Sequence, residues 1–336
     1  MLEISERKKE YDHHLFSFEI PTPFSIGTEN AYLLLGDKLT LIDSGPKTEK
    51  AWKAFIYQLN ENGFRIKDIE QIILTHQHVD HSGLLGMIKE YHPKVRIYTH
   101  PWTIPWVEKD PKFIQQKLIF FRELFSENGL SREQIQEIEN FYSDLDQFMD
   151  PIKIDGILED GMNLEGHLGW KVIHSPGHSL GHIVLYHEKR KILIAGDHII
   201  GHTSAGAFVE PSIEQNEPRP QSVVAYQESL RDLRSLPLSR IYSGHGAVID
   251  DPYEVIDNQL DRFERKKKQL EGFLVEGDFS VYELMKLTYP NRYYKHLALY
   301  FAEVIGHLDL LEIEGKVSTY KQGHIIKYHL EKSSSH

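Results

Sequence analysis

The sequence predicts a mixed α/β protein with a large domain at residues 1–254, a helical insertion at about 102–150 and a small domain at 255–336. Three observations indicate this. Short apolar segments alternate with segments of helical spacing in the large domain, and turns rich in Gly, Pro, Ser or Asp follow many of them. The insertion has helical spacing and almost no glycine. From residue 255 the pattern becomes a charged connecting helix, two more helices and a β-ribbon.

Strand and helix signals alternate along the large domain. Residues 31–35 and 39–42 are apolar and flank Gly36-Asp37, a pattern typical of a β-hairpin. Residues 50–60 have helical spacing, and 71–75 form a short apolar strand. Later helices are expected at 84–91 and 221–236, and later strands at 95–99, 170–174, 183–186, 191–195 and 240–243.

The insertion contains two segments of amphipathic helical spacing. Phe113 and Phe121 belong to the first segment, and Ile138 and Tyr142 belong to the second. Two interpretations stay open. The helices either cover the scaffold or form a lid whose aromatic side chains line a substrate pocket.

Composition limits the classes of function. The chain has 336 residues, of which 40% are hydrophobic and 26% charged, as in an ordinary folded protein. It has no cysteine, which excludes disulfides and thiolate ligands, so any metal must be held by His and carboxylate. A net charge of -12 opposes nucleic-acid binding, although a local basic channel stays open.

The first residues bear on the location of the protein. Residues 1–10 are charged and lack the apolar region of a signal peptide. No apolar run approaches the roughly 20 residues that span a bilayer. We therefore expect a cytoplasmic protein that does not interact with membranes.

The run His76-Gln77-His78-Val79-Asp80-His81 is the strongest functional signal. Three imidazoles and a carboxylate fall within six residues directly after an apolar strand, where a loop would turn them towards one point. His76 and His78 suit one metal ion, and Asp80 and His81 suit a second. The alternative, a solvated polar loop, is disfavoured because this pattern rarely arises by chance.

Three further candidate ligands follow predicted strands. His178 comes after Pro176-Gly177, Asp197 comes after Gly196, and His245 lies between two glycines. Glycine beside each residue lets the backbone turn sharply enough to present the side chain. Each residue alone is as readily explained by a turn or a core hydrogen bond. Together, in this order, they supply what a two-metal site needs.

These motifs resemble the metallo-β-lactamase-fold hydrolases over about residues 15–250. The resemblance implies a four-layer αββα sandwich in which Asp43 braces the ligand loop. It also implies two divalent cations, with zinc as the first choice and iron or manganese as alternatives. By the same resemblance, one ion is bound by His76, His78 and His178, and the other by Asp80, His81 and His245, with Asp197 bridging both.

Two such ions imply hydrolysis by a metal-bound hydroxide, with Asp80 and Asp197 as catalytic residues that orient it and relay a proton. His182 is expected to support the ligands rather than to bind metal, because the donor sets are already filled. His198 and His202 follow Asp197 and are weaker candidates for contact with substrate.

The end of the chain, especially 307–317, resembles the winged-helix tail of the lactamase-β-like protein 2 branch, which contains an endoribonuclease and thioesterases. The insertion is longer than expected there, and the nucleic-acid-handling insertion of β-CASP relatives is absent. From residue 255 onward, 12 Lys and Arg balance 12 Asp and Glu. The only basic cluster in that part is 265–268, on the connecting helix. A structural role or a homodimer contact is therefore favoured over DNA binding.

The aromatic insertion and the acidic composition favour a small or acyl-bearing ester, thioester or lactone as substrate. A metal-dependent endoribonuclease is the first alternative, because of the tail. A non-catalytic binding protein on the same fold is the second, and it is disfavoured because every ligand type is present.

Overall fold

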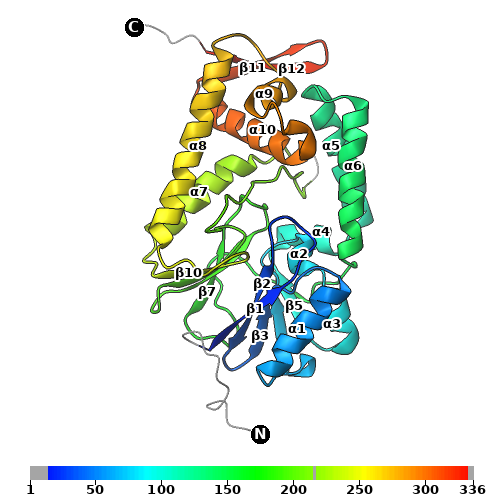
Figure 1. Cartoon of the computed structure of the whole chain (residues 1–336), viewed down its shortest axis with the longest axis vertical. Helices are drawn as coiled ribbons and strands as arrows, with labels where there is room; N and C mark the ends of the chain where they lie inside the picture. Colours follow the sequence, from blue (N-terminus) through cyan, green and yellow to red (C-terminus); the bar gives the residue numbers. More distant parts are fainter. Residues whose placement is uncertain (1–13, 215–216, 332–336) are drawn as a thin grey trace.

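The computed structural model describes residues 14–214 and 217–331, and two mixed β-sheets face each other in the lower half of the view in Figure 1. The charged residues 1–10 lie outside the described residues. The first sheet contains, in spatial order, β1 (Leu15–Ile20), β2 (Glu29–Leu35), β3 (Leu39–Ile42), β4 (Gln71–Ile73), β5 (Arg96–Thr99) and β6 (Gly156–Ile157). The second contains β10 (Arg240–Ser243), β9 (Ile192–Gly196), β8 (Ile183–His187) and β7 (Trp170–His174).

Strand register brings the ends of distant segments together. Strands β3 and β4 are parallel, with Ile42 opposite Ile73, so the residues after both strands leave the sheet at the same edge. In the second sheet, β9 and β10 are also parallel, with Ser243 opposite Gly196. Each sheet therefore presents two strand ends to one region.

Helices cover the outer face of each sheet. α1 (Glu49–Glu61) and α3 (Leu85–Tyr91) pack on the first sheet, and α7 (Ser222–Ser235) and α8 (Pro252–Leu274) pack on the second. In α1, Thr48 caps the first turn by accepting a hydrogen bond from the backbone of Ala51, and Ala51, Phe55 and Leu59 form the buried stripe. The predicted αββα sandwich is confirmed.

A third apolar core joins the insertion to the C-terminal elements. Besides Leu270 and Leu274 at the end of α8, the elements involved are α5 (Pro111–Glu127), α6 (Arg132–Leu145), α9 (Val281–Thr288), α10 (Leu297–Ile313), β11 (Val317–Gln322) and β12 (Ile325–Leu330). We call this group the cap module. Figure 1 shows α5 and α6 beside α9 and α10. The Phe125 and Phe301 rings meet edge to face at 4.8 Å, and Gln134 donates a hydrogen bond to the Tyr282 hydroxyl at 2.8 Å.

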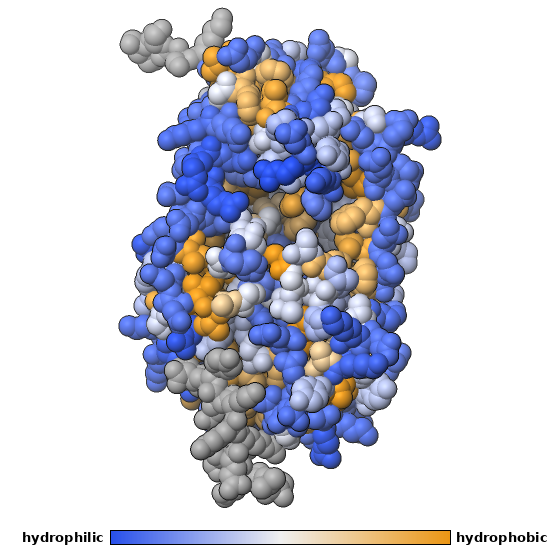
Figure 2. All heavy atoms as spheres, in the orientation of Figure 1, coloured by the Kyte–Doolittle hydropathy of each residue, from blue (hydrophilic) through white to orange (hydrophobic). Residues whose placement is uncertain are grey.

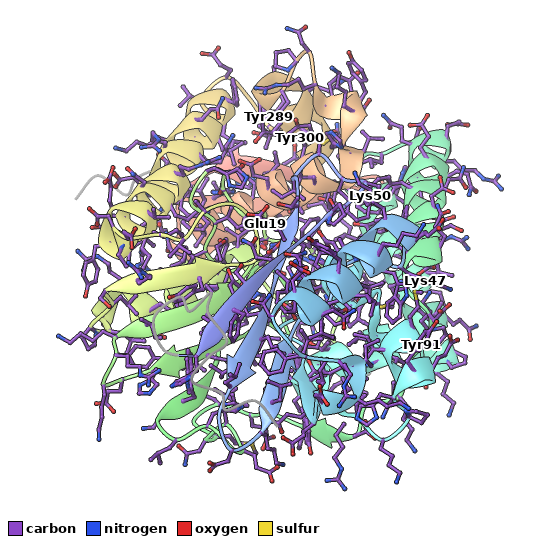
Figure 3. All side chains as sticks on the ribbon, turned by 60° about the horizontal axis from the view of Figure 1, so that its bottom comes forward. Glu19, Lys47, Lys50, Tyr91, Tyr289 and Tyr300 are labelled. Carbon is purple, nitrogen blue, oxygen red and sulfur yellow. The ribbon has the colours of Figure 1, made fainter. Side chains whose placement is uncertain are left out.

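The basic cluster predicted on the connecting helix is partly neutralised inside the protein. Lys266 lies over the ring of Tyr289 and 3.3 Å from Glu303, and Lys267 is buried against Glu314. Tyr289 stacks on Tyr300 with ring centroids 4.2 Å apart, and Figure 3 labels both rings. Two of the four basic residues are thus engaged with the cap module.

Several local features differ from the sequence prediction. Strands β1 and β6 were not predicted, and α2 (Val79–Ser82) is one helical turn where a loop was expected. The short helix α4 (Ile104–Val107) precedes the two long insertion helices. Single 3-10 turns lie at Ile66–Asp68, Pro101–Thr103, Asp146–Phe148 and Tyr293–Lys295.

The surface shows where apolar side chains gather. Figure 2 shows a hollow with apolar atoms near the middle of one face, between the C-terminal elements above and the sheets below. Among the described residues, no helix is both long and apolar enough to cross a membrane.

Candidate metal centre

The His-rich run begins directly after β4, at the edge where the ends of both sheets meet. His78 has an extended backbone, and α2 then turns the chain so that the rings of His81 and His76 lie side by side, with centroids 4.3 Å apart. The helical turn forms because the backbone N–H groups of His81 and Ser82 both donate to the carbonyl of His78. A loop prediction failed here because the local hydrogen bonds close a turn.

The first donor set consists of His76, His78 and His178. The Nδ1 atom of His78 lies 3.0 Å from His76 Nε2 and 2.9 Å from His178 Nε2. Burial, and to a smaller extent the neighbouring His178, lowers the pKa of His78 to about 3. Burial likewise lowers the pKa of His76 and of His178. Three neutral imidazoles with converging nitrogens are the arrangement that a divalent cation needs.

The second donor set consists of Asp80, His81 and His245. The His245 Nε2 atom lies 3.5 Å from an Asp80 oxygen. Burial disfavours the charged form of His245, but Asp197 and Asp80 raise its pKa to about 10. The pKa of His81 is also raised, because Asp197 and Asp43 outweigh its burial. A cation entering this set must displace protons from both imidazoles.

Asp197 lies between the two donor sets. One carboxylate oxygen is 3.2 Å from His81 Nε2, and the other is 3.3 Å from His245 Nε2 and 3.7 Å from His178 Nε2. Burial opposes ionisation, but His81 and His245 hold the pKa of Asp197 well below its usual range. This carboxylate is placed to reach cations in both sets.

The far nitrogens of two ligand imidazoles are held by backbone carbonyls. His178 Nδ1 contacts the Gly206 carbonyl at 2.7 Å, and His245 Nδ1 contacts the Thr28 carbonyl at 2.8 Å. A carbonyl can only accept, so each Nδ1 donates. Each Nε2 faces the site and offers its lone pair to a cation when the imidazole is neutral, which for His245 requires loss of a proton.

Asp43 holds His81 and the strand end together. One Asp43 oxygen lies 3.0 Å from His81 Nδ1, and the carboxylate accepts from the backbone N–H and the hydroxyl of Thr75 at 2.8 and 2.7 Å. Asp43 itself has a left-handed backbone with φ +59°, which is uncommon outside glycine. The contacts match the bracing expected of this residue.

Glycines allow the ligands to approach one another. Gly196 and Gly246 have φ of +48° and +78°, a region that L side chains rarely adopt. A Cβ atom added at Gly244 would lie 2.3 Å from an Asp197 oxygen. Backbone angle and space therefore both require glycine at positions 196 and 246, and space alone requires it at 244.

The three remaining candidate histidines lie behind or beside the donor sets. His182 is fully buried, stacks on His76 and accepts from the backbone N–H of Asp197 at 3.2 Å. His198 is fully buried and packs on Tyr226, 5.4 Å from the His182 ring. His202 is exposed. His182 and His198 thus pack beneath the site.

Sequence reasoning missed three residues at the site. Phe208 packs its ring on His78 and His178, with centroids 4.9 and 5.4 Å away. Glu210 is buried, accepts from Gln77 and from the Leu180 backbone N–H, and has a pKa raised by burial to about 7. The third is Glu29, which is fully buried beside His81. No sequence motif marked Phe208 or Glu210. Glu29 precedes the predicted strand at 31–35, and nothing in that pattern distinguished it.

The donor chemistry of both sets fits two divalent cations of the zinc, iron or manganese type, since all donors are imidazole nitrogen or carboxylate oxygen. Residues 26–245 match the model of the metallo-beta-lactamase superfamily. The chain belongs to this superfamily.

Relatives of the same superfamily extend along nearly the whole chain. The probable metallo-hydrolase YqjP of Bacillus subtilis is 31% identical over 314 residues, which cover 94% of this chain and 97% of that protein. A beta-lactamase-like protein 2 homolog of Caenorhabditis elegans is 25% identical, covering 82% of this chain and 73% of that protein.

A solved structure shares the architecture. A metallo-beta-lactamase family protein from Thermus thermophilus has a TM-score of 0.78 and 25% identity, covering 95% of this chain and 99% of that one. The likeness therefore includes the C-terminal elements. As a superfamily member with intact donor sets, the protein is a metal-dependent hydrolase.

Proposed function

We propose that this protein is a dinuclear hydrolase of small esters, thioesters or lactones. The observation that carries the proposal is the position of Asp197, whose two oxygens lie within 3.7 Å of imidazole nitrogens from both donor sets. When bound, a pair of cations supplies a water activated near neutral pH and polarises the oxygen under attack.

Asp197 and Asp80 are assigned different roles in this reaction. Asp197 is fixed between three imidazoles and orients the attacking water. Asp80 has a side chain that is 13% exposed, against 7% for Asp197. We assign Asp80 the transfer of a proton to the leaving group, because its carboxylate lies nearer to solvent.

The wall beside the first donor set favours an acyl substrate. Phe208 presents an aromatic ring against His78 and His178, which suits a hydrocarbon chain or ring next to the reacting carbonyl. A relative named atrochrysone carboxyl ACP thioesterase, from Aspergillus fumigatus, is 24% identical over 74% of this chain and 61% of that protein. A thioester is therefore the first substrate class to test.

Charge supports an acyl substrate over RNA. The net charge is -12, and Lys266 and Lys267 of the basic cluster contact carboxylates of the protein itself. A nucleic-acid surface would keep such residues free for phosphate.

Metal content and one ligand substitution test the centre. We expect two ions per chain in purified protein, and we expect His78→Ala to lose the first ion and at least ~100-fold in kcat/KM. His324→Ala, which removes an exposed imidazole on the β11–β12 turn, is the matched control and should keep both. Metal-free protein that takes up no zinc, iron or manganese would refute the proposal.

A substrate panel tests the reaction. Thioesters, aryl esters, lactones and single-stranded RNA are assayed in parallel with wild type and His78→Ala. If wild type cleaved RNA but no ester or thioester, and His78→Ala lost that cleavage, the protein would be an endoribonuclease and not an acyl hydrolase. No turnover in any arm by fully loaded protein would favour a binding protein.

Four finer expectations stay predictions. They are zinc as the resident metal, a winged-helix fold for residues 255–336, a homodimer and a cytoplasmic location. Metal analysis of protein from its native host decides the first, and light scattering decides the third.

A further inference from the structure

Glu29 is a buried carboxylate that the proposed reaction does not use. It lies at the start of β2, has no exposed surface, and neither of its oxygens accepts a hydrogen bond from the described residues. One of these oxygens is 3.8 Å from His81 Nδ1, the nitrogen that faces away from Asp197. The side chain is therefore directed at the rear of the second donor set.

The backbone around Glu29 is fixed by contacts with the loop that carries His245. The Thr28 carbonyl accepts a hydrogen bond from His245 Nδ1. Asn30 donates its backbone N–H to the Gly244 carbonyl at 2.7 Å, and its side-chain amide to the Ser243 carbonyl at 3.0 Å. Glu29 also pairs with His245 in an isolated β-bridge. With both neighbours held, the carboxylate cannot turn out to solvent.

A buried carboxylate without hydrogen bonds is costly unless positive charge lies nearby. The charged side chains around Glu29 include the imidazoles of His81 and His245, but also the carboxylates of Asp43 and Asp80. Two divalent cations would bring four positive charges to a centre that contains four carboxylates: Glu29, Asp43 and Asp80, together with Asp197 on the far side of His81. A cation at the second donor set would thus explain why Glu29 is buried without hydrogen bonds.

We propose that Glu29 is a positioning residue of the second donor set, and that its charge strengthens cation binding there from behind His81. This inference rests on the proposed two-cation centre. The Glu29 carboxylate is therefore expected to lower the stability of the metal-free protein and to strengthen cation binding in the folded protein.

The test compares Glu29→Gln, which keeps size and removes charge, with wild type. Glu303→Gln, which removes a carboxylate in the cap module, is the control. Affinity for Co2+ is measured by competition with a chromophoric chelator, and the d–d absorption of Co2+ reports the geometry of each site. We expect Glu29→Gln to weaken the second binding step about 10- to 100-fold and to leave the first step unchanged.

Stability of the metal-free protein supplies the second readout. A neutral amide costs less to bury than an unpaired carboxylate, so metal-free Glu29→Gln should unfold at the same or a higher urea concentration than wild type. A residue needed only for packing would lower this midpoint instead.

The two readouts separate the possible failures. An unchanged second Co2+ step in Glu29→Gln, or a lower urea midpoint without metal, would overturn the role of Glu29 while leaving the proposed hydrolase intact. If wild type itself bound only one Co2+ ion, the two-cation proposal would fail, and the role of Glu29 with it.

Discussion

The ion pair between Arg219 and Asp309 joins the cap module to the loop beside the first donor set. Two Arg219 nitrogens lie 2.8 and 2.5 Å from the two Asp309 oxygens. The side chains are 19% and 2% exposed. Because the same loop carries Gly206, which holds His178, and Phe208, we expect this pair to stabilise both the fold and the metal site.

The magnitude follows from burial. Asp309→Asn leaves a largely buried guanidinium without its paired carboxylate, which costs about 3 kcal/mol. This is the low end of the range for broken buried pairs, because Arg219 keeps some contact with water and an interaction with Glu312. The matched control is Asp257→Asn. Its partner Arg234 makes the same two contacts, at 2.7 and 3.1 Å, but the side chains are 42% and 52% exposed, so the loss of stability should be much smaller than for Asp309→Asn.

Urea unfolding, monitored by circular dichroism, measures the loss of stability in both variants. The value of kcat/KM on the best ester substrate reports whether the metal site is also affected. Only Asp309→Asn should reduce kcat/KM. Replacing both partners, Arg219→Met with Asp309→Leu, should recover most of the stability, since an apolar pair needs no counter-charge. Equal losses for the two Asn variants, or a loss under about 1 kcal/mol for Asp309→Asn, would refute the argument from burial.

Three further outcomes are expected. Gly244→Ala should abolish activity in folded protein, because its Cβ would lie 2.3 Å from Asp197; activity near wild type would show that the strand end relaxes. In metal-free protein, protonated His245, whose pKa is raised to about 10, stabilises the fold fully below about pH 6.5, and this stabilisation is lost as pH rises towards 10. Urea midpoints of His245→Gln should lack this decline with pH. Phe208→Ala should raise KM for long acyl substrates more than for acetyl esters, and equal changes in steady-state kinetics would exclude a role in acyl binding.

Much of the metal centre could be predicted because its signals are local. The six-residue run and the glycines beside Asp197 and His245 place donors at strand ends, and parallel pairing then brings those ends to shared edges. The partition into two donor sets came from the family resemblance. That partition stays a prediction.

The rest depends on tertiary contacts that no local pattern encodes. In the sequence Glu29 precedes the ordinary apolar residues 31–35, and the role proposed for it depends on its pairing with His245, more than 200 residues away. Strand β6 has only two residues and exists because β5 offers an edge for pairing. The amphipathic spacing of α5 and α6 was predicted, but the partner that buries their apolar faces was not.

The shared core of the cap module has an evolutionary consequence. Its two halves, the insertion and the C-terminal elements, are separated in the chain by more than 130 residues, yet neither half can bury its apolar face without the other. Gain, loss or exchange of one half alone between relatives would expose that face. The two segments are therefore expected to be inherited as a pair, so that a change in one is followed by compensating changes in the other.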